Sequence, residues 1–313
     1  MSGSSTTGLS PSAREERAGF VLVFMSALCW STGGVLARFI EAPDPWTVVF
    51  WRSFWAALFL LGFMLWRDGV RGTLRLFSGM GVPGLAVACC LSVSTSFFVL
   101  ALAHTTVANI LLIQAGGPLI AALLSFAVLG VKVSAATWGA IAAVIVGVGV
   151  MVSGSVSGGV SLVGDGLALV IVFAFSITTV LMRRFSHVRM TPATWLGVLI
   201  AATLAAGQAE TLSVSAADMG FLFAFGAINL GLALAFFATG ARLIAPAYTA
   251  LLSTFETLLG PVWVWLVHGE VPAARTLLGG GIVFAALLVH IGIEVRRLSR
   301  PQRPGLTGMP TPH

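Results

Sequence analysis

Trp30–Arg38 reads WSTGGVLAR, and Phe175–Arg183 reads FSITTVLMR. The two stretches lie 145 residues apart, and each has a leading aromatic residue, a serine next to it, a Val-Leu pair and a closing arginine. A second offset, of 139 residues, aligns Phe97 with Phe236. The chain therefore reads as one unit used twice.

The composition is that of a membrane protein. Hydrophobic residues make up 58% of the chain, charged residues only 9%, and the mean hydropathy is +1.00, whereas a soluble domain has about 25% charged residues. A helix needs about 20 apolar residues to cross about 30 Å of hydrocarbon. We count ten such stretches: 18–38, 46–66, 79–103, 106–129, 134–153, 163–183, 192–209, 217–240, 244–268 and 272–295. The sequence predicts an all-α polytopic membrane protein with ten transmembrane helices.

Each repeat then holds five spans. Because five is odd, the second copy crosses the membrane in the opposite sense, which makes an inverted repeat of the kind found in secondary transporters. We expect a first five-helix repeat over 18–153, a linker over 154–163 and a second repeat over 164–296. The tails, 1–17 and 297–313, are expected to be disordered and cytoplasmic.

The charges predict an orientation. With both termini in the cytoplasm, fourteen Lys and Arg lie inside and two outside, which is a strong positive-inside bias and fits a multi-pass protein of the inner (plasma) membrane. The arginines are scattered over short loops, so the net charge of +6 argues against nucleic-acid binding. The three cysteines fall inside spans without Cys/His ligand spacing, and we expect no metal site and no cofactor.

Small residues recur at helical spacing in the fifth and tenth spans. Gly139, Ala143 and Gly147 are four residues apart, as are Gly281 and Ala285. Such stripes allow helices to approach closely. We favour packing between these two equivalent helices over a dimer contact, and expect a monomer or a weak dimer.

Two charged residues lie well inside spans, where insertion scales assign a cost of about 2.5–3.5 kcal/mol. Arg52 is either an anchor for a substrate carboxylate or a structural arginine that bonds carbonyl groups. Glu256 has three readings: a proton-coupling carboxylate, a ligand for a substrate ammonium group, or a protonated acid that locks two helices. Its repeat counterpart is Gly117, so only one half carries this charge.

Uncharged polar and aromatic side chains at span centres complete the candidate substrate site, because an unpaired polar group in hydrocarbon is costly. The polar candidates are Ser31, Ser94, Asn109, Gln114, Ser176, Asn229, Tyr248 and Ser253. The aromatic candidates are Trp30, Phe97, Phe175 and Phe236. We expect Trp30 and its repeat partner Phe175 to face each other and form an apolar cavity wall.

An enzyme is not expected. The chain has no His-Glu-x-x-His, no intramembrane aspartyl pair and no Gly-x4-Gly-Lys-Ser/Thr loop, which excludes the commonest metalloprotease and ATP-binding signatures. A channel or a receptor remains an alternative class, and saturable flux would separate a carrier from a channel.

Several short motifs occur in a familiar order along the chain: Trp30-Ser31, Arg52, Ala101-Leu102, Gly164-Asp165, Glu256 and Gly269-Glu270. Together with the ten spans and the repeat offsets, they resemble the drug/metabolite transporter superfamily, EamA-type ten-helix branch, over about residues 18–296. The chain departs from the family pattern at Thr257, where a proline is usual, and at Val131, where a glutamate is usual.

The resemblance implies a transporter of small organic solutes, often an exporter. It implies a central cavity among the first, third, fourth, sixth, eighth and ninth helices, with the fifth and tenth packed as a brace. Some members, such as the YddG-type exporters, move amino acids, including aromatic ones. Our leading hypothesis is therefore outward movement of amino acids by alternating access. The alternative is a proton-coupled exporter of lipophilic cations or drugs that uses Glu256.

Overall fold

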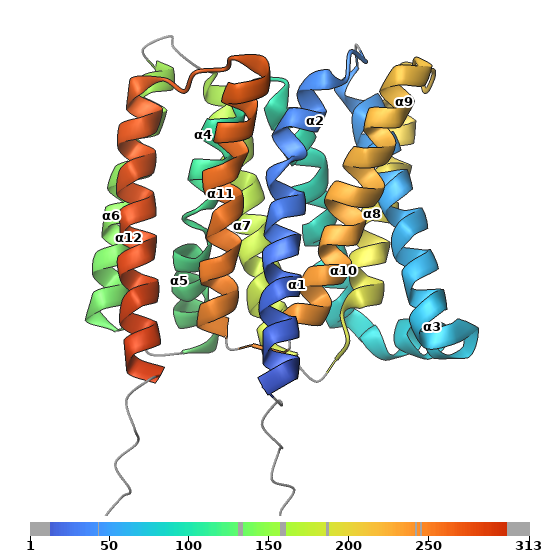
Figure 1. The fold of residues 1–313 in the computed structure, drawn as a ribbon, viewed down its shortest axis with the longest axis horizontal. Helices are drawn as coiled ribbons and strands as arrows, with labels where there is room; N and C mark the ends of the chain where they lie inside the picture. The colour runs from blue at the N-terminus through green and yellow to red at the C-terminus, as the bar shows by residue number, and fades with distance from the viewer. Residues whose placement is uncertain are drawn as a thin grey trace, which may run out of the picture.

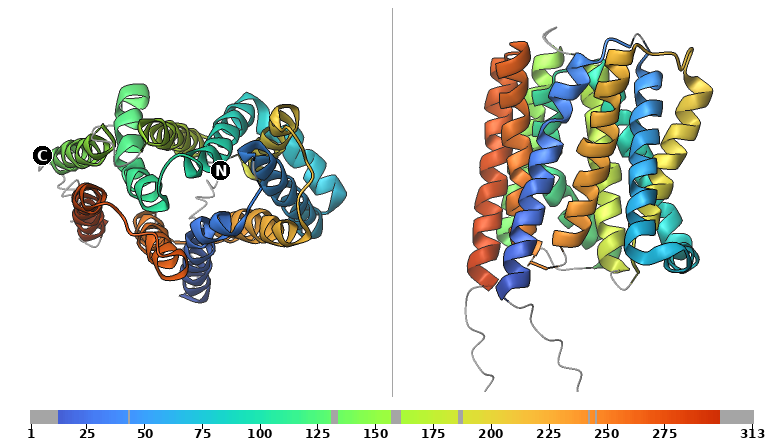
Figure 2. Two further views of the ribbon diagram at one scale, coloured as in Figure 1. Left: turned by 90° about the horizontal axis from the view of Figure 1, so that it is seen from above. Right: turned by 45° about the vertical axis from the view of Figure 1, so that its right-hand side comes forward.

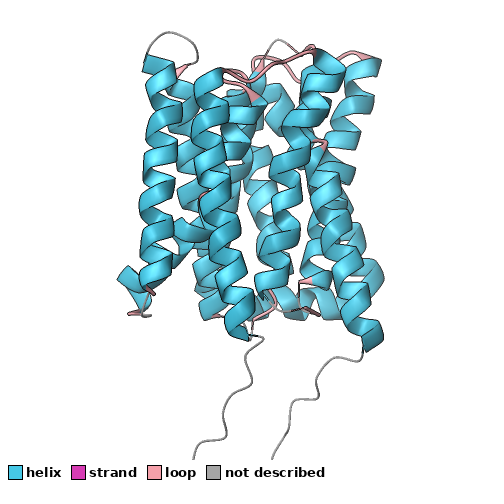
Figure 3. Ribbon diagram, turned by 60° about the vertical axis from the view of Figure 1, so that its left-hand side comes forward, coloured by secondary structure: helices cyan, strands magenta, loops and turns pink. Residues whose placement is uncertain are grey.

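The computed structural model describes residues 13–298, except 43, 131–133, 157–160, 186–187, 242 and 245. All regular secondary structure in this part of the chain is helical, and the helices stand side by side with loops at the two ends (Figures 1 and 3). The elements are α1 (Ala13–Ser31), α2 (Gly33–Phe39), α3 (Pro45–Leu102), α4 (Val107–Gln114), α5 (Gly117–Leu129), α6 (Ala135–Val156), α7 (Leu162–Arg184), α8 (Thr191–Gln208), α9 (Ala216–Phe223), the π-helix η1 (Ala224–Leu232), α10 (Ala233–Gly240), α11 (Pro246–His268) and α12 (Ala274–Leu298).

Seven of the described helices are long and apolar enough to cross a membrane, which agrees with a multi-pass membrane protein. One of them, α3, is 58 residues long and is not a single straight helix. Its backbone turns at Gly69 (φ 66°) and Gly81 (φ 53°), in the left-handed region that glycine enters without steric cost. These turns divide α3 into two legs, residues 45–68 and 82–102, and a connecting piece of residues 70–80, which we call the crosspiece.

The two ends of the bundle differ. The first residue of α1, Ala13, and the last of α12, Leu298, lie at the same end (Figure 1; Figure 2, right), and we call this the terminal end. The crosspiece also lies there. The helix α1 begins at Ala13, inside the segment expected to be disordered, and carries Glu15 and Glu16 in its first turn, where carboxylates favour the helix macrodipole. The tails 1–12 and 299–313 and residues 157–160 of the predicted linker lie outside the described residues, and the two ends of that linker are helical, since α6 runs to Val156 and α7 begins at Leu162.

Three of the expected spans are interrupted, and the hydropathy pattern did not reveal this. The first stops being helical at Thr32, between α1 and α2, and the fourth is interrupted at Ala115 and Gly116, between α4 and α5. The eighth contains η1, a π-helix of nine residues. Single π-helical turns inside α-helices are often found at functional sites, so these interruptions direct attention to the middle of the bundle.

The apolar core joins elements that are far apart in the sequence. Its largest cluster combines α3, α4, α6, α7, η1 and α12, and Phe225 of η1 is its largest fully buried side chain. A smaller cluster fills the contact between α3 and α8 around Leu60 and Val198. Figure 1 shows α3 and α8 at one side of the bundle and α6 and α12 at the other. The polar residues discussed below lie between these two pairs.

The helices α6 and α12 meet through glycine. A Cβ atom on Gly147 would lie 2.6 Å from the carbonyl oxygen of Gly279, and one on Gly279 would meet the carbonyl oxygen of Gly147. The expected packing between the two helices is confirmed at Gly147, but its partner is Gly279. Gly139 and Gly281 instead have no atom within 4 Å of a Cβ.

Substituting this glycine contact should loosen the α6–α12 pair. We expect Gly279→Ala to lower the free energy of unfolding by about 1–3 kcal/mol, the usual cost of overpacking, because the added methyl group meets backbone that cannot rotate away. Gly281→Ala, two residues along the same helix, is the control and should have little effect. Thermal unfolding in detergent checks both, and equal melting temperatures for the two variants would contradict the assignment.

Candidate functional site

The break between α1 and α2 is closed by polar side chains from other helices. The Ser31 hydroxyl donates to the carbonyl three residues earlier and accepts from Trp263 Nε1 at 3.1 Å. Asn229 of η1 donates through Nδ2 to the carbonyl oxygens of Cys29 (2.7 Å) and Trp30 (3.1 Å). Helix interruptions leave carbonyls without their usual intrahelical donors. Here the Cys29 carbonyl also accepts from the N–H and the hydroxyl of Thr32, and Asn229 adds a donor to both carbonyls. Ser31 and Asn229, both expected at the substrate site, thus hold this break in place.

The polar groups at the break between α4 and α5 are less completely hydrogen-bonded. Gln114 is the last residue of α4, and its Nε2 is buried without a hydrogen-bond partner among the described residues. Beyond the break, the Gly117 carbonyl accepts from Ser176 Oγ of α7 at 3.1 Å. A buried amide donor without a partner calls for a ligand or a water molecule. Gln114 is thus a predicted site residue with a buried donor that has no partner in the described part of the chain.

Arg52 lies deep in the first leg of α3, with 5% of its surface exposed. Its guanidinium carbon lies 4.2 Å from the ring centroid of Phe225 and 5.2 Å from that of Phe98, and Nη1 donates to the Thr95 carbonyl at 3.4 Å. Cation–π contacts of this kind stabilise a desolvated guanidinium. Its Nε has no hydrogen-bond partner in the described part of the chain. Arg52 therefore bonds a carbonyl, as the structural reading expected, and retains a free donor.

Glu256 is half-buried near the middle of α11. Its charge and that of Arg52 attract each other, but the two side chains form no salt bridge in the described structure. An acid and a base thus lie in separate halves of the chain, near enough to interact and without direct contact.

The aromatic candidates do not arrange themselves as expected. Trp30 contacts Phe237, with ring centroids 5.3 Å apart, and no ring contact joins Trp30 and Phe175 among the described residues. The side chain of Phe175 is 46% exposed. Phe97 and Phe236 are half-buried, and Phe97 packs against the main core. The ring that packs on Trp30 is thus that of Phe237, the residue next to the predicted Phe236.

The remaining hydroxyl candidates are bonded locally or to neighbouring backbone. Ser253 Oγ donates to the Thr249 carbonyl at 3.0 Å within α11, and Ser94 Oγ donates to the Ile171 carbonyl of α7 at 3.4 Å. Backbone bonding of this kind is common for Ser and Thr in membrane helices, so Ser94 and Ser253 offer little to a ligand. Tyr248 packs its ring against Phe20, with centroids 5.3 Å apart.

Asn109 belongs to a buried polar network that the sequence did not indicate. Its Nδ2 donates to Asp165 Oδ1 and to Thr105 Oγ1 (3.4 Å), and its Oδ1 accepts from Thr276 Oγ1 at 3.2 Å. Asn109, Asp165 and Thr276 are 0%, 1% and 2% exposed. The network joins α4, α7 and α12, which makes Asn109 a packing residue. Asp165 was recognised only as part of a motif.

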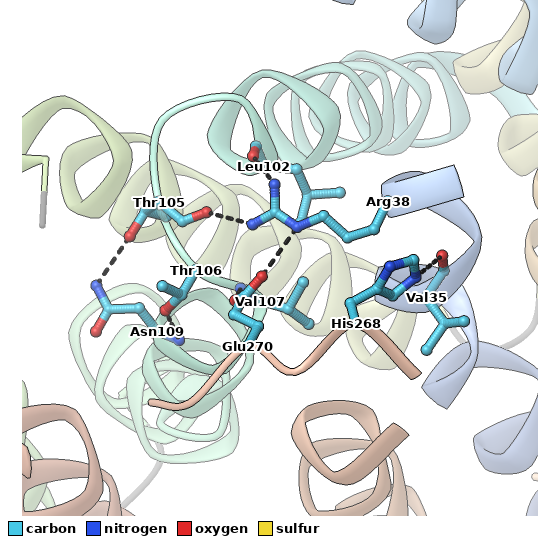
Figure 4. Close-up of polar contacts among 9 residues, drawn as sticks. All are labelled: Val35, Arg38, Leu102, Thr105, Thr106, Val107, Asn109, His268 and Glu270. Atoms are coloured by element: carbon cyan, nitrogen blue, oxygen red, sulfur yellow. Dashed lines mark hydrogen bonds and ion pairs between the residues drawn. The ribbon is translucent and has the colours of Figure 1, made fainter. Parts of the chain in front are cut away.

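A second cluster, shown in Figure 4, closes the bundle at the end opposite the termini. Arg38 pairs with Glu270 (Nε to Oε2, 3.0 Å) and donates to the carbonyls of Leu102 (3.1 Å) and Thr105 (3.2 Å). The other carboxylate oxygen, Glu270 Oε1, accepts from the Val107 backbone N–H at 3.0 Å. The arginine thus donates to carbonyls near the C-terminal end of α3, and the carboxylate accepts from an N–H at the N-terminal end of α4. Helix ends favour these charges, because the C-terminal carbonyls attract cations and the N-terminal N–H groups attract anions. We call this set the closure cluster.

His268, the last residue of α11, adds to the closure cluster. Its Nε2 lies 3.2 Å from the Val35 carbonyl oxygen of α2, and its ring lies 4.6 Å from that of Phe39. Phe39 also stacks on Phe221 of α9 at 5.0 Å. The cluster therefore connects α2, α4 and α9 with the loop between α11 and α12. In the sequence, Arg38 stood out only as the closing arginine of the first repeated stretch and Glu270 only as a motif residue, and nothing in their spacing signalled the pair.

Comparisons with known proteins agree with this fold. Residues 17–153 match the model of the EamA-like transporter family. A solved structure, described only as the crystal structure of a protein, has a TM-score of 0.63 at 17% sequence identity and aligns over 91% of this chain and 99% of its own. That likeness concerns the fold alone. The comparison with curated proteins finds no match. Over residues 17–153, the chain thus matches the EamA-like transporter family, part of the drug/metabolite transporter superfamily, which is a family of membrane transporters of small molecules.

Proposed function

We propose that this protein is a secondary transporter that moves small organic metabolites, amino acids first among them, outward across the inner membrane. The observation that carries the proposal is the placement of Arg52 and Glu256, which interact across the two halves of the chain without a salt bridge. A zwitterion has one anionic and one cationic end. The charge of Arg52 would suit the anionic end, and that of Glu256 would suit the cationic end. The contact between Trp30 and Phe237 would provide an apolar wall for a neutral or aromatic side chain.

The proposed architecture is that of ten spans in two inverted five-helix repeats. The two legs of α3, each long enough to cross, and the helices α8 and α11, of 18 and 23 residues, support the count of ten. Both termini would be cytoplasmic, since the positively charged loops belong inside. Alternating access would then arise from movement of one repeat against the other around the central site.

The closure cluster is the proposed outer gate. Arg38 and Glu270 belong to different repeats, and their pairing (3.0 Å) ties the α11–α12 loop to α2. At the offset of 139 residues, the counterpart of Glu270 in the first repeat is Val131. Valine carries no charge. The electrostatic closure would therefore be specific to one side of the membrane.

Removing the charge of Glu270 should favour opening of this gate. The side chains of Arg38 and Glu270 are 32% and 21% exposed, and partly exposed pairs contribute about 0.2–1 kcal/mol, so we expect an increase in opening of roughly two- to five-fold. The background is a chain with Cys29, Cys89 and Cys90 changed to alanine, and Leu111→Cys places one cysteine below the cluster. The measurement is the rate at which an impermeant maleimide labels this cysteine. Glu210→Gln, an exposed acid in the α8–α9 loop, is the matched control. Unchanged labelling in Glu270→Gln would refute the gate.

The experiment that tests the transport proposal is flux from proteoliposomes preloaded with a panel of radiolabelled amino acids. Saturable flux of a subset supports an amino-acid carrier, and flux that does not saturate favours a channel. Absence of flux for every amino acid would exclude the proposed cargo. A lipophilic cation is the second candidate cargo, favoured by the single acidic group at the centre, Glu256, and is tested in the same vesicles with a pH gradient.

A further inference from the structure

The crosspiece, residues 70–80 of α3, is a short helix that does not cross the bundle. It begins after the turn at Gly69 and ends before the turn at Gly81, and Figure 1 shows it running across the foot of the bundle at the terminal end. A helix of this length extends about 16 Å, too short to span hydrocarbon. It therefore lies at the level of one membrane surface.

Three sides of the crosspiece have different surroundings. One side packs on the bundle: Thr73 is 3% exposed, and Phe77 contacts Trp195 at 5.2 Å between ring centroids. A second side is apolar and open, with Val70 and Leu74 65% and 64% exposed. Residues four apart share a helix face, so these two side chains form one ridge beside the bundle.

The third side carries Arg71 and Arg75, which are also four residues apart and exposed. Neither forms an ion pair among the described residues. The acid nearest in sequence, Asp68, is already bound by Arg189 through two bonds of 2.9 and 3.1 Å and lies 3.4 Å from Arg67. The two arginines of the crosspiece are therefore free for an external anion.

Exposed apolar side chains also lie beyond both ends of the crosspiece. Trp66 before the first turn is 82% exposed, and Val82 after the second is 80% exposed. Helices with an apolar face beside a basic one lie in the membrane interface, with the apolar side chains at the acyl boundary, and tryptophan is enriched at that depth. The guanidinium groups then reach the level of the headgroups, where phosphate accepts paired hydrogen bonds from arginine.

We propose that the crosspiece is an interfacial helix that binds anionic phospholipid headgroups through Arg71 and Arg75, with Val70 and Leu74 set among the acyl chains. Each basic residue near an anionic leaflet contributes an attraction that corresponds to roughly a five-fold enrichment of charged lipid. The bound lipid would anchor the loop between the two legs of α3. This site is separate from the central charges and does not depend on the transported solute.

The test uses the full chain with Cys29, Cys89 and Cys90 changed to alanine and a fluorophore attached at Leu74→Cys. The protein is reconstituted in vesicles of phosphatidylcholine and phosphatidylglycerol of one composition, with brominated acyl chains on either one lipid or the other. We expect quenching by brominated phosphatidylglycerol to exceed that by brominated phosphatidylcholine by roughly five-fold. The excess should disappear in Arg71→Gln/Arg75→Gln.

Arg14→Gln/Arg17→Gln is the matched control, because it removes two exposed arginines of α1 at the same end of the bundle and should leave the excess unchanged. Added salt should reduce the excess quenching by phosphatidylglycerol in the chain that keeps both arginines, since salt screens exposed charges. This test does not depend on whether an arginine variant folds. Equal quenching by the two lipids would overturn the headgroup assignment. Absence of quenching by both would place the crosspiece outside the membrane, on water or on an acidic protein partner, and would also overturn it.

Discussion

Replacing Asn109 by leucine should lower the free energy of unfolding by about 3 kcal/mol. Asn109 is fully buried and donates to Asp165, which is itself 1% exposed. Leucine has a similar volume but no donor, so the carboxyl group of Asp165 loses this hydrogen bond while it stays buried. Removing one donor from a buried carboxyl group costs more than the net value of an ordinary hydrogen bond.

The measurement for Asn109→Leu is equilibrium unfolding in mixed detergent micelles, with helical signal as the readout. Thr276→Val is the matched control, because it removes only the 3.2 Å hydrogen bond to Asn109 Oδ1 and should cost about 1 kcal/mol. If the two variants lose the same stability, the network is not centred on the Asn109–Asp165 bond. A large loss for Asn109→Leu alone would establish it as the polar clamp between α4 and α7.

Glu256→Gln should abolish the part of transport that a pH gradient drives, while exchange of unlabelled for labelled substrate continues. Glutamine keeps the size and the hydrogen-bonding capacity of the side chain but cannot release a proton. If Glu256 also binds a substrate ammonium group, the affinity of the variant for that substrate should fall roughly ten-fold or more, since hydrogen bonds to charged groups contribute about 1.5–3 kcal/mol. Both results come from the same proteoliposomes.

Glu270→Gln is the control for Glu256→Gln, because it makes the same change on the same half of the chain but in the closure cluster. It should alter access from the outer side and leave the response to a pH gradient in place. If Glu256→Gln and the unsubstituted protein respond equally to a pH gradient, Glu256 is not the coupling group, and its reading as an acid that locks two helices gains support.

Hydropathy predicted the helices well, but it did not predict their interruptions. The ends of α6, α8 and α12 lie within three residues of the expected spans. The breaks in the first and fourth spans were missed, because residues such as Ser31 and Gln114 raise or lower mean hydropathy very little. A donor from another helix, such as Asn229 at the carbonyl of Trp30, helps to make a break tolerable, and hydropathy does not record it.

The candidate substrate site stays a prediction, but the structure shows how its residues are bonded. Arg52 and Glu256 stood out because charge in a span is rare, and the structure brings them into electrostatic reach of each other. Asn109 and Ser31 were chosen by the same reasoning, yet their polar groups are bound within the protein. A polar residue in a span must find a partner, but the sequence does not say whether that partner is a ligand or another helix.

The sequence by itself determined that this is a multi-pass helical membrane protein, because hydropathy accumulates residue by residue and needs no knowledge of neighbours. The tertiary structure alone decided which polar groups are engaged and which are free. The Arg38–Glu270 pair joins residues 232 positions apart, and the Asn109–Asp165 bond joins residues 56 apart. Such pairings depend on the direction and the distance of side chains from packed helices, and these are set only when the whole bundle forms.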